Sequence, residues 1–139
     1  MGWRIEIVDT AADGDIAELR DLLFEFNYDA TGYRDGRSLS CFLRDEQGVL
    51  VAGLDGFTWG GYAWVELLWV HASQRGHGTG RALLAAAEDE ARRRGCRTIA
   101  LQTHDFQAPD FYPKYGYETV GATIDTPVGY RQLLFQKLL

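Results

Sequence analysis

The stretch Ser73–Leu84, SQRGHGTGRALL, places three glycines within five residues, directly before an alanine- and leucine-rich segment. A glycine inside a helix is unfavourable by about 1 kcal/mol relative to alanine, so three at the start of the clearest helical pattern need a reason. A strand, a glycine-rich turn and a helix N-terminus together form an anion site. The first helical N–H groups are unpaired, and glycines let a ligand come close to them. The stretch therefore predicts a ligand that carries phosphate.

The spacing of the glycines argues against two common nucleotide loops. Gly76, Gly78 and Gly80 follow the pattern G-x-G-x-G, and Arg81 stands where a dinucleotide fingerprint has its third glycine. The phosphate loop G-x-x-x-x-G-K-[ST] needs a lysine that this stretch lacks. A domain that uses the loop for ATP or NAD is thus disfavoured, and glycines that only form a tight turn stay as an alternative.

Hydrophobic periodicity on both sides of the loop predicts a mixed α/β domain. We expect strands at Trp3–Asp9, in two arms around a hairpin turn at Asp45–Gly48, at Tyr62–His71, at Cys96–Thr103, and at Glu118–Ile124 and Tyr130–Leu139. We expect helices from Asp13, with the apolar face Ile16, Leu19, Leu22, Leu23 and Phe26, at Arg81–Gly95, and briefly within Ala108–Tyr117. Residues 27–38 are predicted to form a loop, and the nearly all-apolar strand at Tyr62–His71 to be buried on both faces.

Composition restricts the class of protein. A chain of 139 residues without repeats or linkers fits one domain, 1–139. Its net charge of −6 argues against a nucleic-acid surface, and no apolar run is long enough to cross a membrane. The N-terminus lacks a secretory signal pattern, so we expect a cytoplasmic protein. Cys41 and Cys96 could form one disulfide, but buried free thiols are favoured.

Two segments resemble signatures of the GNAT superfamily of N-acyltransferases. LWVHASQRGHGTGRALL, at Leu68–Leu84, is similar to its acyl-CoA signature, in which a strand leads into R-G-x-G-x-G and a helix. APDFYPKYGYE, at Ala108–Glu118, is similar to its A-x-x-F-Y-x-x-x-G-F/Y segment. The resemblance implies an α/β fold whose central, mostly antiparallel mixed sheet is splayed between its fourth and fifth strands and flanked by helices. Acetyl-CoA would bind in the gap as co-substrate.

The resemblance also implies which residues bind acetyl-CoA. Backbone N–H groups in the glycine loop would hold the pyrophosphate, and the strand edge before it would pair with the pantetheine arm. The Val70 N–H would stabilise the oxyanion of the thioester. The implied binding residues are Leu68, Val70, Arg75, Gly76, His77, Gly78, Thr79, Gly80, Arg81 and Asp105. His77 stands at a variable position, and Asp105 stands where the family often has an asparagine, so it brings negative charge towards an anionic ligand.

Tyr112 occupies the position where the family usually has its general acid. A tyrosine stays protonated at neutral pH, so it can donate to the departing thiolate of CoA. The alternative is that Tyr112 only packs, as its neighbours Phe111, Tyr115 and Tyr117 are expected to do. Pro113 directly after it departs mildly from the family pattern, although proline is tolerated in a first helical turn.

Glu66 is the candidate general base, because it is the only acid in an otherwise apolar strand. Desolvation there would suit a base that works near neutral pH. Three alternatives stay open: Glu66 paired with an arginine or facing solvent, His104 as the base, or a chain of water molecules. Trp64 and Trp69 on the same strand are favoured as core residues over a substrate cage.

The resemblance implies an N-acetyltransferase that acts on a primary amine of a small molecule or peptide, by direct attack in a ternary complex. The acceptor would meet the acetyl group near the loop after the first helix, where residues 28–35 mix aromatic and charged side chains. A non-catalytic acyl-CoA-binding module is the alternative from another class. No spacing of ligands predicts a metal site. Family habit makes a homodimer an expectation that no residue requires.

Overall fold

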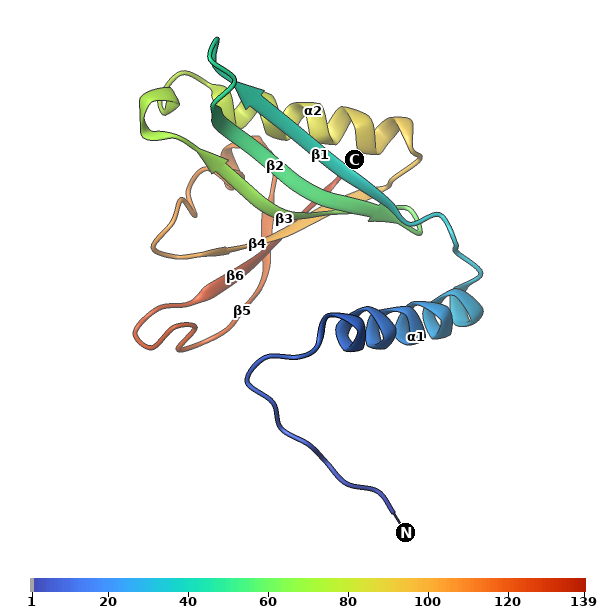
Figure 1. Ribbon diagram of the computed structural model, residues 1–139. Helices are drawn as coiled ribbons and strands as arrows, with labels where there is room; N and C mark the ends of the chain where they lie inside the picture. Colours follow the sequence, from blue (N-terminus) through green and yellow to red (C-terminus); the bar gives the residue numbers. More distant parts are fainter. Residues whose placement is uncertain (1) are drawn as a thin grey trace. The chain divides into compact units, whose positions relative to one another are not determined.

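The computed structural model describes residues 2–139, which form two compact units. The N-terminal unit ends at Arg34, and the second unit spans Asp35–Leu139. The chain order of elements within them is shown in Figure 1. Among the described residues, no helix is both long and apolar enough to cross a membrane.

The N-terminal unit consists of an extended segment and one helix, so the strand predicted at Trp3–Asp9 is wrong. Residues 2–34 contain no strand, and the side chains of Trp3, Ile5 and Ile7 are more than 90% exposed. A strand needs a neighbour to bond its backbone groups, and residues 2–34 offer none. Alternation of apolar and polar residues is therefore not sufficient evidence for a strand.

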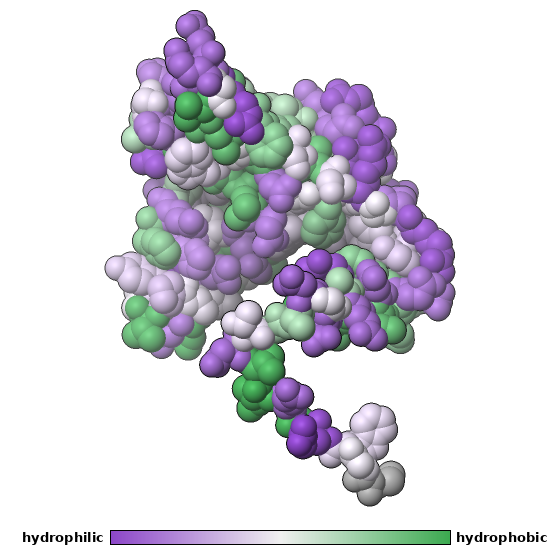
Figure 2. Space-filling view, viewed as in Figure 1, coloured by the Kyte–Doolittle hydropathy of each residue, from purple (hydrophilic) through white to green (hydrophobic). Residues whose placement is uncertain are grey.

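Helix α1 spans Asp13–Thr31 and begins and ends differently from the prediction. Ala12, rather than Asp13, is its N-cap, and the helix continues into the segment expected to be a loop. Gly32 ends it with φ of 77°, and its N–H donates to the Tyr28 carbonyl at 2.7 Å. No residue of the helix is buried. Figure 2 shows hydrophobic and hydrophilic residues side by side on the visible face of α1.

The second unit is built on one six-stranded sheet with the order β1-β2-β3-β4-β6-β5. The strands are β1 (Arg37–Arg44), β2 (Leu50–Trp59), β3 (Tyr62–Val70), β4 (Thr98–His104), β5 (Glu118–Ala122) and β6 (Gln132–Leu138). Only β3 and β4 pair in parallel, and every other neighbouring pair is antiparallel. The predicted mixed, mostly antiparallel sheet is confirmed.

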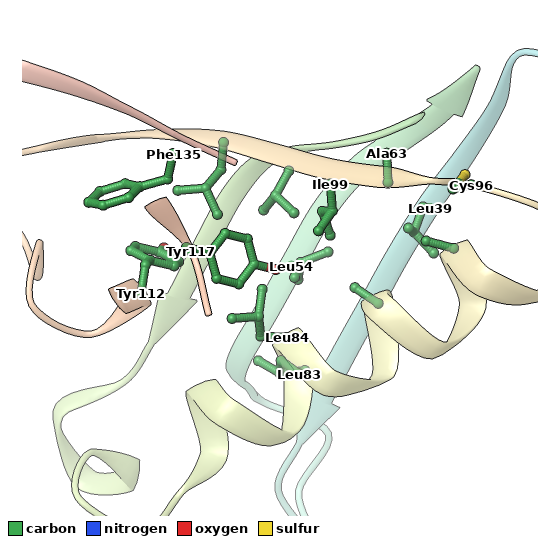
Figure 3. Packing of buried hydrophobic residues seen from close by; sticks show 14 of the residues in the cluster. Leu39, Leu54, Ala63, Leu83, Leu84, Cys96, Ile99, Tyr112, Tyr117 and Phe135 are labelled. Carbon is green, nitrogen blue, oxygen red and sulfur yellow. The ribbon is translucent and has the colours of Figure 1, made fainter. Parts of the chain in front are cut away.

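Helix α2, Thr79–Arg93, covers one face of the sheet. Its apolar stripe includes Leu84, Ala87 and Ala91, which are at most 1% exposed. These side chains pack against Leu54 of β2 and Ile99 of β4 in the principal core (Figure 3). The small alanines let the helix backbone approach the strands closely, and this contact fixes the start of α2 beside the end of β3.

The C-terminal part of the unit packs its aromatic side chains against the same core. The 3₁₀-helix η2, Tyr112–Tyr115, precedes β5, and the rings of Tyr112, Tyr117 and Phe135 lie together (Figure 3). The Tyr117 hydroxyl donates to Glu88 of α2 at 2.8 Å, and the Lys137 ammonium of β6 lies 2.7 Å from the same carboxylate. This buried network ties α2 to β5 and β6.

Strand β3 is buried on one face only, which corrects the prediction that both faces are covered. Ala63 and Val65 point towards α2 and are buried, whereas Leu67 and Trp69 are 64% and 47% exposed. Trp64 is half-buried and lies outside the core cluster, so neither Trp64 nor Trp69 is the core residue expected. Cys41 and Cys96 are free thiols, as predicted, but only Cys96 is buried, whereas Cys41 is half-buried.

Candidate active site

The two middle strands of the sheet separate partway along their length. β3 and β4 pair only from Tyr62 opposite Thr98 to Val65 opposite Leu101. Beyond that point β3 still pairs with β2 and β4 still pairs with β6. The sheet is therefore split between β3 and β4. In the sequence-based numbering, which also counted a strand at Trp3–Asp9, these are the fourth and fifth strands.

The split leaves one edge of β3 with backbone groups that face away from β2. The His71 N–H donates to the Val51 carbonyl at 2.8 Å, and the register places Val70 opposite Ala52 and Leu68 opposite Leu54. Hydrogen-bonded pairs alternate along an antiparallel ladder, so the N–H groups of Leu68 and Val70 point towards the split. An extended ligand can add to this edge as a strand would.

The glycine loop follows β3 and ends at the first turn of α2. Gly76 and Gly78 both have φ of 78°, which disfavours any residue with a side chain. Gly78 is the N-cap of α2, and the first helical hydrogen bond runs from the Ala82 N–H to its carbonyl. The N–H groups of residues 79–81 precede that bond, so they form an anion site at the positive end of the helix.

Gly80 differs from the other two glycines, because its conformation does not require glycine. Its φ lies outside the left-handed region, and an added Cβ would meet Phe111 and Val70 only at ordinary distances of 3.5 and 3.7 Å. Alanine would therefore fit the fold at this position. The reason left for a glycine here is the close approach of a ligand to the backbone.

The charged side chains of the loop are partly engaged within the protein. The Arg75 Nε donates to the Val70 carbonyl at 3.0 Å, which fixes the loop to the end of β3. The Arg81 guanidinium lies over the Tyr115 ring, 5.3 Å from its centroid. His77 is exposed between the two left-handed glycines. Arg75 and Arg81 thus remain beside the anion site, held in place by contacts that leave their charge available.

Tyr112 lies at the start of η2 and is 8% exposed. Burial raises the pKa of its hydroxyl, so Tyr112 remains a proton donor at neutral pH. Its hydroxyl makes no hydrogen bond to residues 2–139, yet no buried side-chain polar atom among them lacks a partner. The hydroxyl must therefore reach solvent, and Tyr112 is one of the residues that line a cleft at the split.

Glu66 lies at a β-bulge in β3. The register pairs Val65 with Gly56 and Leu67 with Asp55, so Glu66 has no partner opposite it. Its side chain is exposed, which removes the desolvation that the sequence suggested. Its carboxylate accepts a hydrogen bond from the Trp64 indole N–H at 2.7 Å. Within residues 2–139 no arginine or lysine pairs with Glu66, so the arginine-paired alternative is wrong.

One cleft of about 360 Å³ brings Glu66 and Tyr112 together at the split. Trp64 and Leu68 of β3 line it on one side, and His104 at the end of β4 lines it on the other. The rest of the polar lining consists of Thr103 and three glutamines, Gln102, Gln107 and Gln132. The cleft therefore combines a tyrosine, a carboxylate and neutral hydrogen-bonding groups beside an open strand edge.

Asp105 and His104 both have partners at this end of the sheet. The Asp105 carboxylate accepts from the Arg131 N–H at 3.1 Å, and its own N–H donates to the Arg131 carbonyl. The Gln107 side-chain carbonyl accepts from the His104 N–H at 2.8 Å and lies 3.3 Å from the His104 ring. Asp105 thus joins the end of β4 to the start of β6, whereas His104 faces the cleft.

A larger cavity of about 630 Å³ lies beside the C-terminal end of α2. Arg94 lines it, and its guanidinium donates to the Ser38 carbonyl at 2.8 Å and to the Thr58 hydroxyl at 3.1 Å. These bonds dock α2 on β1 and β2, and neither Glu66 nor Tyr112 lines this cavity. Within residues 2–139 no group of three histidine, cysteine or acidic side chains could hold a metal ion.

Two features of the site were missed by sequence reasoning. Trp64 was expected in the core, although it lies two residues before Glu66, close enough on one strand for the two side chains to meet. Gly56 was not considered at all, yet it provides the space for the bulge, because a Cβ there would overlap the Trp64 carbonyl. A glycine inside a strand pattern was the available signal.

The split sheet, the loop at the start of α2 and the acid-lined cleft together define an acyl-CoA-dependent acyltransferase. Residues 6–117 match the model of the Acetyltransferase (GNAT) family. The chain belongs to this family, as its sequence signatures indicated. It is an acyl-CoA-dependent acetyltransferase.

Similar proteins agree with this assignment. Acetyltransferase Atu2258 of Agrobacterium fabrum is 34% identical over 117 residues, which are 84% of this chain and 85% of that protein. Blasticidin-S acetyltransferase of Streptomyces morookaense is 42% identical over 95 residues, 68% of this chain and 70% of that protein. The crystal structure of an acetyltransferase from Agrobacterium tumefaciens has a TM-score of 0.92 at 31% identity, covering 99% of this chain and 100% of its own.

Proposed function

We propose that this enzyme transfers the acetyl group of acetyl-CoA to a primary amine of a small molecule by direct attack. The observation that carries the proposal is the presence of Glu66 and Tyr112 in one cleft where β3 and β4 separate. A carboxylate and a neutral phenol are the two groups that amine acetylation needs. One takes a proton from the attacking amine, and the other gives a proton to the leaving sulfur.

The donor would lie along the open edge of β3. The pantetheine arm pairs with Leu68 and Val70, and the pyrophosphate rests on the N–H groups at the start of α2. Arg75 and Arg81 add positive charge beside it. In this pose the Val70 N–H donates to the thioester oxygen, where negative charge grows as the amine attacks.

The acceptor needs help to lose a proton. A lysine-like amine has a pKa of about 10.4, so only roughly 0.1% is neutral at pH 7.4. Glu66 attracts the cationic form and takes one proton from it, which it later releases to solvent, so that the nitrogen lone pair is free to bond to the thioester carbon. As the carbon–sulfur bond breaks, the nitrogen loses its second proton to solvent, and Tyr112 protonates the thiolate of CoA and regains a proton from solvent. The burial that raises the pKa of Tyr112 keeps that proton available.

The relative from Streptomyces suggests which amines to test first. That protein is named for blasticidin S, a small molecule, and it is 42% identical to this chain over 95 residues. The three glutamines of the cleft suit an acceptor with several hydrogen-bonding groups. Blasticidin S and similar polar amines are therefore the first acceptors in our proposal.

The test measures CoA release and acetylated product with acetyl-CoA and a panel of polar amines. We expect at least one amine to gain one acetyl group. Tyr112→Phe should lower kcat about 10²- to 10⁴-fold, the usual contribution of a general acid, at unchanged acetyl-CoA affinity. Tyr115→Phe, on the same short helix, is the matched control. Full turnover by Tyr112→Phe would remove Tyr112 from the mechanism, and tight acetyl-CoA binding without transfer to any amine would favour a non-catalytic binding module.

A further inference from the structure

Within residues 2–139, one hydrogen bond holds the Glu66 carboxylate. The Trp64 indole Nε1–H donates to its Oε2 at 2.7 Å, and no other hydrogen bond or ion pair within residues 2–139 reaches this carboxylate. Both side chains line the cleft between β3 and β4. They lie two residues apart on one strand, on either side of Val65, where the pairing with β4 ends, and the hydrogen bond joins them.

The two residues differ in how firmly the sheet holds their backbones. Trp64 lies in the last fully paired part of β3, opposite Phe57 of β2 and Ala100 of β4. Glu66 lies one residue beyond the end of the β3–β4 pairing, and it is the unpaired residue of the bulge against β2. A bulge re-aims the side chain that it carries, so the ladder alone does not fix the direction of Glu66. A hydrogen bond to Trp64, whose backbone is paired with both β2 and β4, does fix that direction.

The chemistry of the indole suits this purpose. An indole N–H only donates, so it neither competes for the proton of the acceptor amine nor supplies one to the carboxylate. It occupies Oε2 and leaves Oε1 without a hydrogen bond to residues 2–139. A long acidic side chain that is exposed loses rotamer freedom on being held, and the charge-assisted bond offsets that loss.

We propose that Trp64 is a positioning residue that holds the Glu66 carboxylate with Oε1 directed at the acceptor amine. The inference rests on the proposed function, in which Glu66 takes the proton of that amine. Trp64 touches neither the thioester nor the leaving group in this account. It acts through Glu66 alone, and removing its N–H should matter only while Glu66 carries a carboxylate.

The first measurement observes the bond without any acceptor. The chain has four tryptophans, so a ¹H–¹⁵N spectrum contains four indole signals, and Trp64→Phe identifies the one from Trp64. We expect Glu66→Gln to shift that signal and to leave the Trp69 signal in place. A Trp64 signal that Glu66→Gln does not move would overturn the proposal whether or not an acceptor is known.

The second measurement is a double-mutant cycle on turnover with an amine that the wild-type enzyme acetylates. We expect Trp64→Phe to lower kcat at least tenfold, with the KM for acetyl-CoA unchanged. In the Glu66→Gln background the same substitution should change kcat less than twofold, because its target is already gone. Trp69→Phe, which replaces the next tryptophan on the same strand, should stay within twofold of wild type.

Two outcomes contradict the proposal in different ways. If Trp64→Phe lowers kcat by the same factor with and without the Glu66 carboxylate, Trp64 acts through general packing. If Glu66→Gln alone retains wild-type turnover, Glu66 is not the base, and the positioning role fails with it while acetyl transfer itself stands. Thermal unfolding of each variant shows whether Phe preserves the packing of the Trp64 ring.

Discussion

At the scale of single residues, two tyrosines that lie close together in the sequence, Tyr112 and Tyr117, have different surroundings in the structure. Tyr112 and Tyr117 are both buried, and their rings lie 5.8 Å apart. The Tyr117 hydroxyl donates to Glu88, whereas Tyr112 lines the cleft at the split. Tyr117 therefore ties α2 to β5, and Tyr112 is the tyrosine that we propose as the general acid.

Replacement of Tyr117 by phenylalanine should change stability in a pH-dependent way. Burial and the nearby Glu88 carboxylate raise the pKa of Tyr117 above its usual value of 10. Above pH 10 the unfolded chain loses this proton before the folded one does, so wild-type stability should fall by up to about 1.4 kcal/mol per pH unit from this group. Tyr117→Phe should remove that contribution, and at pH 7 it should destabilise by about 2 kcal/mol through loss of the bond to a charged group.

Denaturant unfolding between pH 7 and 11 measures both effects. Tyr130→Phe, which replaces a 48% exposed tyrosine, is the control and should retain wild-type stability at pH 7. An alkaline loss of stability that is the same in Tyr117→Phe and wild type would show that another group causes it.

At the scale of elements, the glycine loop separates conformation from ligand approach. Gly76 and Gly78 are required by their left-handed backbone, whereas Gly80 is not. The sequence predicted the loop, the helix and the phosphate site together, but it attributed all three glycines to ligand approach. The positive φ of Gly76 and Gly78 depends on the path that the backbone takes out of β3, and the spacing of glycines in the sequence does not reveal that path.

Gly80→Ala tests whether the third glycine of the loop is present because a ligand approaches its backbone closely. Alanine is the better helix former, so the free protein should be stabilised by up to about 1 kcal/mol. The affinity for acetyl-CoA should fall at least tenfold, because the methyl group would lie where the pyrophosphate approaches. Gly14→Ala in the first turn of α1 is the matched control and should leave the affinity unchanged. Calorimetric titration measures the affinity of both variants for acetyl-CoA, and thermal unfolding measures their stability. An affinity of Gly80→Ala equal to that of the wild type would show that Gly80 faces no ligand.

The bulge between β2 and β3 is the element that presents Glu66, and it depends on Gly56. A Cβ at Gly56 would overlap the Trp64 carbonyl, which is backbone and cannot rotate away. Gly56→Ala should therefore destabilise the protein by about 3 kcal/mol and abolish turnover. Gly121→Ala, at the irregular pairing of β5 with β6, has room for its methyl group and should be tolerated. A stable, active Gly56→Ala variant would show that the bulge is not needed.

At the scale of the whole molecule, the sequence predicted the second unit well and the N-terminal unit poorly. The strands from Arg37 onwards form where alternation, turns and apolar runs placed them, because each has a partner within the sheet. The segment Trp3–Asp9 has the same local pattern and forms no strand. Local patterns report which structures a segment favours, and pairing in space decides which of them forms.

The candidate site was predictable to the same extent: local signals identified its residues, and pairing in space brought them together. Tyr112 and the glycine loop were predicted because family signatures carry them, and Glu66 was predicted because it is the only acid in an otherwise apolar strand. The meeting of Glu66 and Tyr112 in one cleft needed the split between β3 and β4, and the bond from Trp64 needed the bulge. Both are properties of strand register, which one sequence does not specify.

The most direct test of the account is the thermal stability of the protein with acetyl-CoA, CoA, ATP and NAD side by side. A ligand present at a hundred times its dissociation constant should add about 2.7 kcal/mol, which raises the Tm by several degrees, about 5–10 °C for a domain of this size. We predict this rise with acetyl-CoA and CoA, and none with NAD. A rise with NAD alone, or none with either CoA species, would contradict the claim that the split sheet and the glycine loop bind acyl-CoA.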